Sequence, residues 1–192
     1  MSSKINIAIF ASGNGSNAEN IADFFKSNSN IIIDSFYTNK ENAFVIERAK
    51  NLGIPCFYYP NQDFRQGNLV LSKLQERKID FVVLAGFLLK IPVNILEVFP
   101  NKILNIHPAL LPKYGGKGMY GDRVHQAVKE SGDTESGITI HYVNECYDEG
   151  DPVFQARCTV LPSDSADDIA DKVHKLEYLH FPKVIAQTIG DL

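Results

Sequence analysis

Residues 5–17 read INIAIFASGNGSN, and the rest of the fold can be predicted outward from this stretch. The near-continuous apolar run 5–10 predicts a strand that is buried on both faces, as strands of parallel sheets are. Residues 11–16 are rich in glycine and predict a tight turn, and Asn17 is predicted to cap a helix that runs to about Phe25. A strand, a turn and a helix in this order open a βαβ unit.

The same alternation continues through the first two thirds of the chain. Strands that alternate with helices in this way indicate right-handed crossovers and a parallel sheet. Gly53 falls where a left-handed residue commonly ends a helix. The further strands are predicted at 31–37, 54–59, 80–85 and 102–106, with helices at 43–52, 69–75 and 93–98.

The last third of the chain follows a different pattern. After a glycine-rich loop and a helix, two extended segments, 137–143 and 152–161, lie close together in the sequence and predict an antiparallel pair. A final helix is predicted to begin near Ser163 or Asp164. We therefore expect one α/β domain over residues 1–192, with a Rossmann-like, mostly parallel sheet, helices on both faces and a late antiparallel strand pair.

The composition is that of an ordinary globular domain. Of the 192 residues, 44% are hydrophobic and 22% are charged, with a formal net charge of −4. This balance argues against nucleic acid as a partner, because binding to a phosphate backbone needs a surplus of cations. No apolar run approaches the ~18–20 residues of a membrane span, and the start of the chain lacks the apolar length of a signal peptide.

The cysteines suggest neither a disulfide framework nor a metal site. Cys56, Cys146 and Cys158 are odd in number, widely spaced and outside any zinc-ligand pattern. We expect a cytoplasmic protein without a bound metal, and with no nucleic-acid or membrane partner.

The glycine-rich turn at 12–17 is the first candidate site. Backbone N–H groups at the start of a helix attract anions, and the helix dipole adds to the attraction. Gly13, Gly15 and Ala18 also fit a loose dinucleotide pattern, which expects an acidic residue near the end of the second strand. Tyr37 and the residues after it supply none, so a phosphate monoester is favoured over NAD. A tight turn without a ligand is the remaining alternative.

Asn105 and His107 form the second candidate site, at the end of the fifth predicted strand. Residues two apart in a strand project to the same side, and Pro108 keeps His107 out of the helical region. The carboxyl ends of parallel strands are where open α/β sheets bind ligands. An amide beside an imidazole could polarise a carbonyl there. The alternative is a histidine that bonds only to backbone.

An acidic loop between the two late extended segments is the third candidate. A carboxylate close to His107 would orient the ring and favour its protonated form. The residues alone do not choose among the loop's four carboxylates, Glu145, Asp148, Glu149 and Asp151. Their spacing does not match a calcium-binding EF-hand loop.

Outside these three sites, the remaining histidines are assigned ordinary structural roles. His125 lies on a predicted helix face, and His174 and His180 lie on the last helix. His141 occupies the polar face of an alternating strand, and the alternative is that this face is also the site face. Glu177 lies at the margin of an apolar helix stripe.

The chain resembles the phosphoribosylglycinamide formyltransferases, a branch of the folate-dependent formyltransferase family. The resemblance extends from Ile5 to about Gln187. HPALLPKY is shared by the wider family, and SGNGSN is typical of this branch. The matching segments are IAIFASGNGSN, NKENAFVIERAKNLGI, DFVVLAGFLLKI, ILNIHPALLPKYGG and HYVNECYDEGDPV.

The resemblance implies transfer of a formyl group from the co-substrate 10-formyltetrahydrofolate to the amine of glycinamide ribonucleotide in purine biosynthesis. It implies small-molecule substrates, no metal, and a monomer or weak homodimer. The implied catalytic residues are Asn105, His107 and Asp148, and the implied ribonucleotide contacts are Gly15, Ser16, Asn17, His174 and Glu177. The implied folate contacts are Arg65, Leu88, Leu89, Lys90, Ile91, Asn105, Asn144, Glu145, Cys146, Tyr147 and Asp148.

Two departures from the family pattern concern the pocket. Lys90 follows Leu88 and Leu89 where many members have an arginine close after the glycine and phenylalanine, and the glycine-rich loop at 115–123 is longer than the usual form. The alternatives are a methionyl-tRNA or nucleotide-sugar formyltransferase, or a non-catalytic protein that binds a phosphate ligand on the same scaffold. The negative charge argues against a tRNA substrate.

Overall fold

The computed structural model describes residues 4–190, which form two compact units. The first unit extends to Leu104 and the second begins at Asn105, so the boundary falls within strand β5 (Ile103–His107). The hydrogen-bonded strand order is β3-β2-β1-β4-β5-β6-β7.

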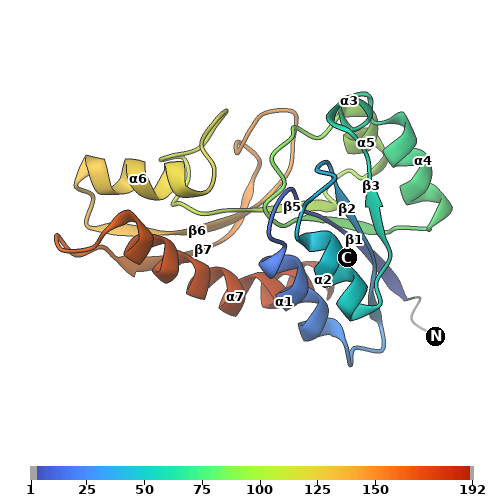
Figure 1. Ribbon diagram of the computed structural model, residues 1–192, viewed down its shortest axis with the longest axis horizontal. Helices are drawn as coiled ribbons and strands as arrows, with labels where there is room; N and C mark the ends of the chain where they lie inside the picture. The colour runs from blue at the N-terminus through green and yellow to red at the C-terminus, as the bar shows by residue number, and fades with distance from the viewer. Residues whose placement is uncertain (1–3, 191–192) are drawn as a thin grey trace. The chain divides into compact units, whose positions relative to one another are not determined.

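The first unit is built from parallel βαβ crossovers. β1 pairs in parallel with β2 and with β4, and β2 pairs with β3. Because the chain steps one way from β1 to β3 and then back to β4, right-handed crossovers put α1 and α2 on one face and α4 and α5 on the other (Figure 1). The elements are β1 (Ile5–Phe10), α1 (Ser16–Phe25), β2 (Ile31–Thr38), α2 (Val45–Leu52), β3 (Cys56–Tyr58), α3 (Asn61–Gln66), α4 (Asn68–Glu76), β4 (Phe81–Leu84) and α5 (Val93–Val98).

An aromatic cluster fills the first unit below the carboxyl ends of β1 and β2. The ring of Phe10 lies 5.0 Å from that of Tyr37, 5.3 Å from that of Phe87 and 5.6 Å from that of Phe64, measured between centroids. All four side chains are buried. Edge-on and tilted aromatic packing of this kind stabilises a fold by more than the burial of apolar surface alone. The loops that follow these strand ends are therefore supported by a well-packed core.

The second unit is an antiparallel strand pair covered by helices. β6 (Glu135–Tyr142) pairs with β7 (Pro152–Thr159), with Glu135 opposite Thr159 and Ile140 opposite Phe154. The long helix α7 (Ala166–Gly190) packs along both strands, and α6 (Asp122–Ser131) lies beside it (Figure 1).

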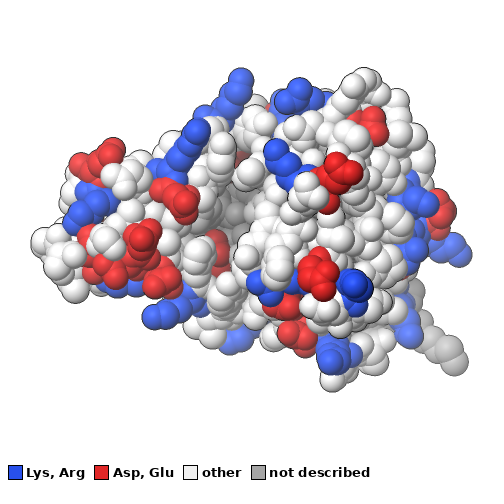
Figure 2. Space-filling view, in the orientation of Figure 1, with Lys and Arg blue, Asp and Glu red and all other residues white. Residues whose placement is uncertain are grey.

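A reciprocal cap fixes the start of α7. The Asp168 carboxylate accepts hydrogen bonds from the N–H and the hydroxyl of Ser165, and the Ser165 hydroxyl accepts one from the N–H of Asp168. This is a capping box, which satisfies N–H groups that the first helical turn leaves unpaired. Asp and Glu side chains gather over this part of the unit (Figure 2), where the helix dipole favours negative charge.

The predicted α/β class, with a mostly parallel sheet and a late antiparallel pair, is confirmed. The predicted cap of α1 is wrong: Gly15, with φ of 76°, precedes the helix, and Asn17 is its second residue. Helix α3 was not predicted because Phe64 is its one buried residue and gives no apolar period. The extent of one domain over residues 1–192 remains a prediction. No helix among residues 4–190 combines the length and apolarity needed to cross a membrane.

Candidate active site

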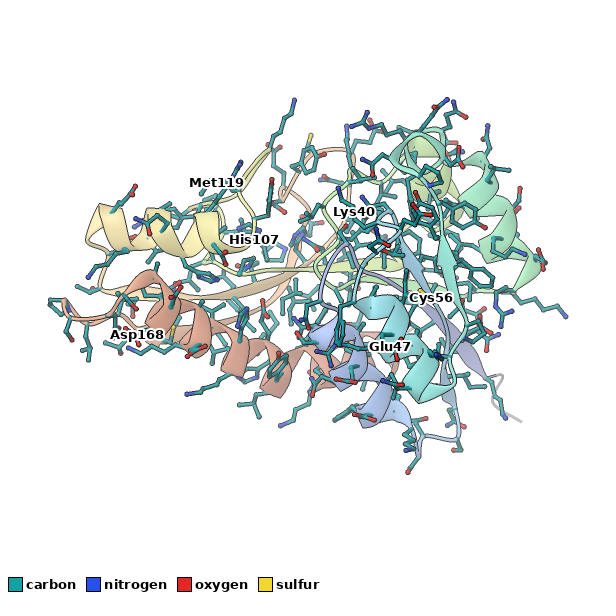
Figure 3. The ribbon with its side chains drawn as sticks, viewed as in Figure 1. Lys40, Glu47, Cys56, His107, Met119 and Asp168 are labelled. Carbon is teal, nitrogen blue, oxygen red and sulfur yellow. The ribbon has the colours of Figure 1, made fainter. Side chains whose placement is uncertain are left out.

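Four polar side chains of the second unit meet at the end of β5. Asn105 Nδ2 lies 3.0 Å from His141 Nε2. His107, which is labelled in Figure 3, is at the last position of the strand. Its side chain is buried, with 3% exposed. Asp148, from the loop between β6 and β7, faces both histidines. Its carboxylate oxygens lie 3.5 Å from His107 Nδ1 and 3.7 Å from His141 Nε2. The structure thus brings the three predicted catalytic residues together and adds His141.

Backbone geometry explains why Asp148, of the four carboxylates in its loop, faces the histidines. Its φ is 57°, a left-handed conformation that Asp tolerates better than most residues, and its Oδ2 accepts a 2.9 Å hydrogen bond from the N–H of Gly116. Gly150 passes so close to the Tyr142 carbonyl that any Cβ there would overlap it. The loop is therefore held at Asp148 and at Gly150, whereas the other three carboxylates are exposed.

Both ring nitrogens of His107 face acceptors. Nε2 lies 2.7 Å from the Tyr114 carbonyl oxygen, and Nδ1 faces Asp148. These two acceptors favour the protonated ring, as the sequence suggested, but burial outweighs them and lowers the pKa of His107 below its ordinary value. The expectation of a protonated His107 is therefore corrected for the free protein at neutral pH.

Asp148 is ionised at neutral pH. Burial alone would raise the pKa of this carboxyl group, but the imidazoles of His141 and His107 and the N–H of Gly116 together lower it below its usual range. The site therefore combines a half-buried carboxylate with a buried imidazole, an arrangement suited to proton transfer.

The tautomer of His141 follows from its partners. Nδ1 lies 2.8 Å from the carbonyl oxygen of Tyr142 and therefore carries the proton, so Nε2 accepts from the amide of Asn105. This bond fixes which end of the Asn105 side chain is the donor. Nδ2 has a second N–H that is not used by His141.

In the first unit, the glycine-rich loop is tied to its surroundings through Ser12. Its N–H donates to the Gly86 carbonyl, its hydroxyl donates to Asn39 Oδ1 at 2.6 Å, and the N–H of Leu88 donates to that hydroxyl at 3.0 Å. The loop after β1 is thus bonded to the segments that follow β2 and β4. Parallel strands end at a common edge, which is where α/β sheets bind ligands.

Helix α2 holds the same loop from its other side. Arg48 donates from Nε to the Asn14 carbonyl at 2.9 Å and from Nη2 to Asn14 Oδ1 at 2.8 Å, and it forms an ion pair with Glu19. A Cβ at Gly15 would lie 2.5 Å from Val45 Cγ2. Only glycine fits this left-handed position, so the backbone of the turn is preorganised.

The other predicted ligand positions are divided between the two units. Arg65 lies in α3, and in the segment after β4 Leu88 is 41% exposed while Ile91 is buried. In the second unit Glu177 is 6% exposed on α7, whereas His174 is exposed, with its ring edge-on to that of His125. Leu89, Lys90, Asn144, Glu145, Cys146 and Tyr147 are half-buried or exposed loop residues.

Three features of the candidate sites in the two units were not predicted. They are the bonds of His141 to its neighbours, the Tyr114 carbonyl beside His107, and Arg48 on the glycine-rich loop. The polar face of the 137–143 segment was a signal for the first, and the other two depend on contacts that no local pattern encodes. Within residues 4–190, no group of three or more His, Cys, Asp or Glu side chains is arranged to hold a metal ion.

Residues 5–185 match the model of the formyl transferase family, and the chain belongs to that family. Among its relatives is the chloroplastic phosphoribosylglycinamide formyltransferase of Arabidopsis thaliana, 40% identical over 185 residues, which cover 93% of this chain and 63% of the plant protein. The enzyme of the same name from Haemophilus influenzae is 36% identical over 93% of this chain and 84% of its own length.

Solved structures of proteins with the same name are similar to this chain. The crystal structure of phosphoribosylglycinamide formyltransferase from Streptococcus pneumoniae superposes with a TM-score of 0.86 at 31% identity, covering 96% of this chain and 99% of that one. The chain spans about 60% of the length of its plant relatives, at 63% and 59%.

Proposed function

We propose that the protein transfers a formyl group from 10-formyltetrahydrofolate to the amine of glycinamide ribonucleotide, a step of purine biosynthesis. The observation that carries the proposal is the meeting of Asn105, His107 and Asp148 at the end of β5 in a member of the formyl transferase family. Relatives named for this activity support it.

In this reaction the neutral amine attacks the formyl carbon and forms a C–N bond, which converts the formyl oxygen into an oxyanion. The tetrahedral intermediate then breaks its bond to N10 of the folate, which takes up a proton as the amine nitrogen loses one. Asn105 Nδ2 has a further N–H available for the oxyanion, because only one is used by His141. Removing a single such donor typically costs about 10²–10³-fold in rate.

His107 and Asp148 supply the proton transfer. A proton that His107 takes up on Nδ1 lies between the ring and the Asp148 carboxylate, while the proton on Nε2 is held by the Tyr114 carbonyl. Because both nitrogens face acceptors, direct donation from His107 to the oxyanion would break one of these contacts. Negative charge that develops on the substrate raises the pKa of the ring, so the pair gains a proton as the amine loses one.

The ribonucleotide is assigned to two groups of residues. Gly15, Ser16 and Asn17 offer backbone N–H groups at the start of α1 to the phosphate, which is where a helix favours an anion. Arg48 and Val45 hold this turn in shape. Glu177 and His174 of α7 are assigned to the same substrate on the basis of the family match.

The folate co-substrate is assigned to Arg65, to Leu88, Leu89, Lys90 and Ile91, to Asn105, and to Asn144, Glu145, Cys146, Tyr147 and Asp148. Exposed Leu88 and Tyr147 offer apolar surface for an aromatic ring system. The chemistry needs no metal, because side chains handle the charge. We also propose that the protein works as a monomer or weak homodimer in the cytoplasm, on small molecules and not on nucleic acids or membranes.

The test is formyl transfer by the purified protein. 10-Formyltetrahydrofolate is mixed with glycinamide ribonucleotide, and the formylated product is quantified by mass spectrometry, with His107→Ala as control. Methionyl-tRNA and an amino-sugar nucleotide serve as rival acceptors. Product with the ribonucleotide, lost in the control, supports the proposal. Transfer only to a rival acceptor, or binding of the ribonucleotide without turnover, would overturn it.

A further inference from the structure

The Tyr114 carbonyl, which holds His107 Nε2, belongs to the segment 109–114 that follows β5. Nε2 lies 2.7 Å from this oxygen, within hydrogen-bond distance, whereas Nδ1 lies 3.5 Å from the Asp148 carboxylate. While the oxygen keeps this position, the neutral ring therefore carries its proton on Nε2. Contacts that fix the position of this segment therefore also fix the tautomer of the neutral His107 ring. Two sets of hydrogen bonds do so, centred on Thr139 and on Asp133, and within residues 4–190 neither of these two residues is hydrogen-bonded to His107.

The first set is centred on Thr139 of β6. Its hydroxyl donates to the Ala109 carbonyl at 2.7 Å and accepts from the N–H of Leu111 at 2.9 Å. Gln155 of β7 completes it: Nε2 donates to the Leu111 carbonyl at 3.0 Å and to the Thr139 hydroxyl at 2.9 Å. The side-chain amide of Gln155 thus binds both the backbone of the segment, at Leu111, and the Thr139 hydroxyl that holds the segment.

The second set is centred on Asp133, in the turn between α6 and β6. Its Oδ2 accepts from Lys113 Nζ and from the Tyr114 hydroxyl, each at 2.9 Å. The Tyr114 hydroxyl also lies 2.6 Å from Ser131 Oγ. These bonds anchor the far end of the segment, at the residue whose carbonyl meets His107.

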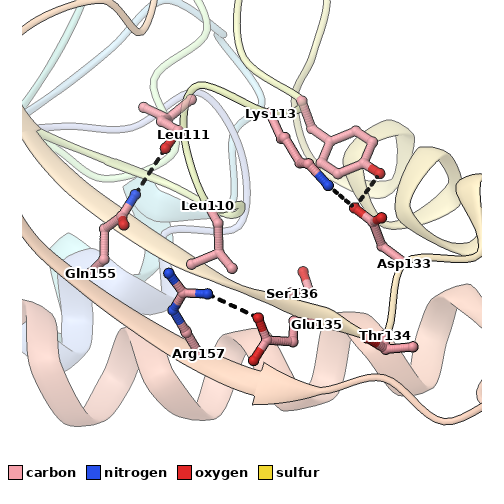
Figure 4. Close-up of a pocket in the computed structure, with 10 residues that line it drawn as sticks. Leu110, Leu111, Lys113, Asp133, Thr134, Glu135, Ser136, Gln155 and Arg157 are labelled. Atoms are coloured by element: carbon pink, nitrogen blue, oxygen red, sulfur yellow. Dashed lines mark hydrogen bonds and ion pairs between the residues drawn. The ribbon is translucent and has the colours of Figure 1, made fainter.

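An open cavity of about 340 Å³ lies on one side of the segment. It is lined by Leu110, Leu111, Lys113 and Tyr114 and by 133–136, Gln155 and Arg157 (Figure 4). Side-chain packing is therefore incomplete on this side, and the hydrogen bonds of Gln155 and Asp133 hold the segment there.

We propose that Gln155 and Asp133 are positioning residues, which set the tautomer and orientation of His107 through the Tyr114 carbonyl. The expected effect on turnover rests on the proposed catalytic role of His107. The expected effect on the tautomer and orientation of the His107 ring does not depend on that role. Neither residue is a catalytic residue, because each acts through the segment.

The variants are Gln155→Met, which keeps length but cannot donate, and Asp133→Ala. Arg157→Met is the matched control, because Arg157 is on the same strand as Gln155 and lines the same cavity but pairs with Glu135. Protein labelled with ¹⁵N-histidine is titrated by NMR, with the His107 signals assigned from His107→Gln. Steady-state kinetics are measured across the same pH range, and circular dichroism checks that each variant is folded.

We expect the wild type and Arg157→Met to show one neutral tautomer of His107 with the proton on Nε2. In Gln155→Met and Asp133→Ala we expect mixed tautomers and a His107 pKa lower than in the wild type, since the carbonyl that favours protonation is displaced. We expect kcat to fall about 10- to 100-fold with little change in KM, the cost of a small misplacement of a reacting group.

Unchanged His107 signals in a folded variant would remove that residue from the proposal, and unchanged signals in both would overturn it. An Arg157→Met variant with the same changes would also overturn it, because the cavity wall rather than the ties would then be responsible. If His107→Ala retains full transfer activity, the proposed catalytic role fails, while the NMR result still decides the positioning.

Discussion

His125 makes the stability of the protein depend on pH in the range where histidine titrates. The side chain, on α6, is 2% exposed, and its Nδ1 has no hydrogen-bond partner among residues 4–190. Its ring lies edge-on to that of His174, with centroids 6.2 Å apart. Burial and then the charge of His174 lower the pKa of His125 to about 4.

The magnitude follows from the two pKa values. In the unfolded chain histidine has a pKa of ~6.5, so below that pH the unfolded state binds a proton that the folded state does not bind until lower pH. The contribution of His125 is fully present above pH ~6.5, falls as the pH falls, and is completely lost below about 4. The free energy of unfolding should drop by ~2 kcal/mol between pH ~7 and ~5, out of a total of ~3 kcal/mol.

The assay is urea unfolding of the wild type and of His125→Phe at pH ~7 and ~5, followed by circular dichroism. Phenylalanine keeps a buried ring of similar size but binds no proton, so it should remove ~2 kcal/mol of the pH dependence. His180→Phe, at a half-buried position of α7, is the control and should leave most of the dependence in place. Equal pH dependence in the wild type and in His125→Phe would refute the reasoning.

Four further outcomes are expected. Asp148→Asn should lower the transfer rate by about 10²-fold or more. The pH at which its remaining activity declines should be lower than in the wild type, because the carboxylate that raises the His107 pKa is gone. An unshifted pH profile would contradict this. Gly15→Ala should lower the free energy of unfolding by ~2 kcal/mol or more in urea, through a left-handed φ and the clash with α2, whereas Gly13→Ala, in open space, should change it little. Glu177→Gln should raise the KM for the ribonucleotide and not that for the folate, and wild-type kinetics would return Glu177 to a structural role. Limited proteolysis should cut the glycine-rich loop at 115–123 in the free protein and more slowly with both substrates; equal rates would count against a closing loop.

The sequence predicts the regular elements well where apolar residues alternate with the period of the structure. Strand 5–10 and helix 93–98 have the predicted bounds, and Gly53 ends α2 in the left-handed conformation. The helix cap at Asn17 was wrong because the left-handed turn at Gly15 starts the helix at Ser16, which places Asn17 inside the first turn. The short helix α3 has too few apolar residues to show a period.

The site is predictable only in part, for a physical reason. The strand-end pair Asn105 and His107 is encoded locally by a spacing of two and a following proline. The choice of Asp148 among four loop carboxylates depends on its φ, on Gly150 and on a bond from Gly116, none of which the residues alone express. The pKa of His107 likewise depends on how far the ring is buried. The sequence shows carboxylates in a nearby loop, but it does not show this burial.

Gly150 has a consequence for how this protein can change. No side chain can be accommodated beside the Tyr142 carbonyl, so the backbone at position 150 is a fixed point at the end of the loop that precedes it. The side chains of residues 145–147 are exposed, so they can vary in chemistry while the carboxylate at 148 stays in place. If the protein has the proposed function, a combinatorial library at those three positions would explore the choice of formyl donor separately from the proton chemistry. Glycine at 150 would be the residue to leave out of the randomisation.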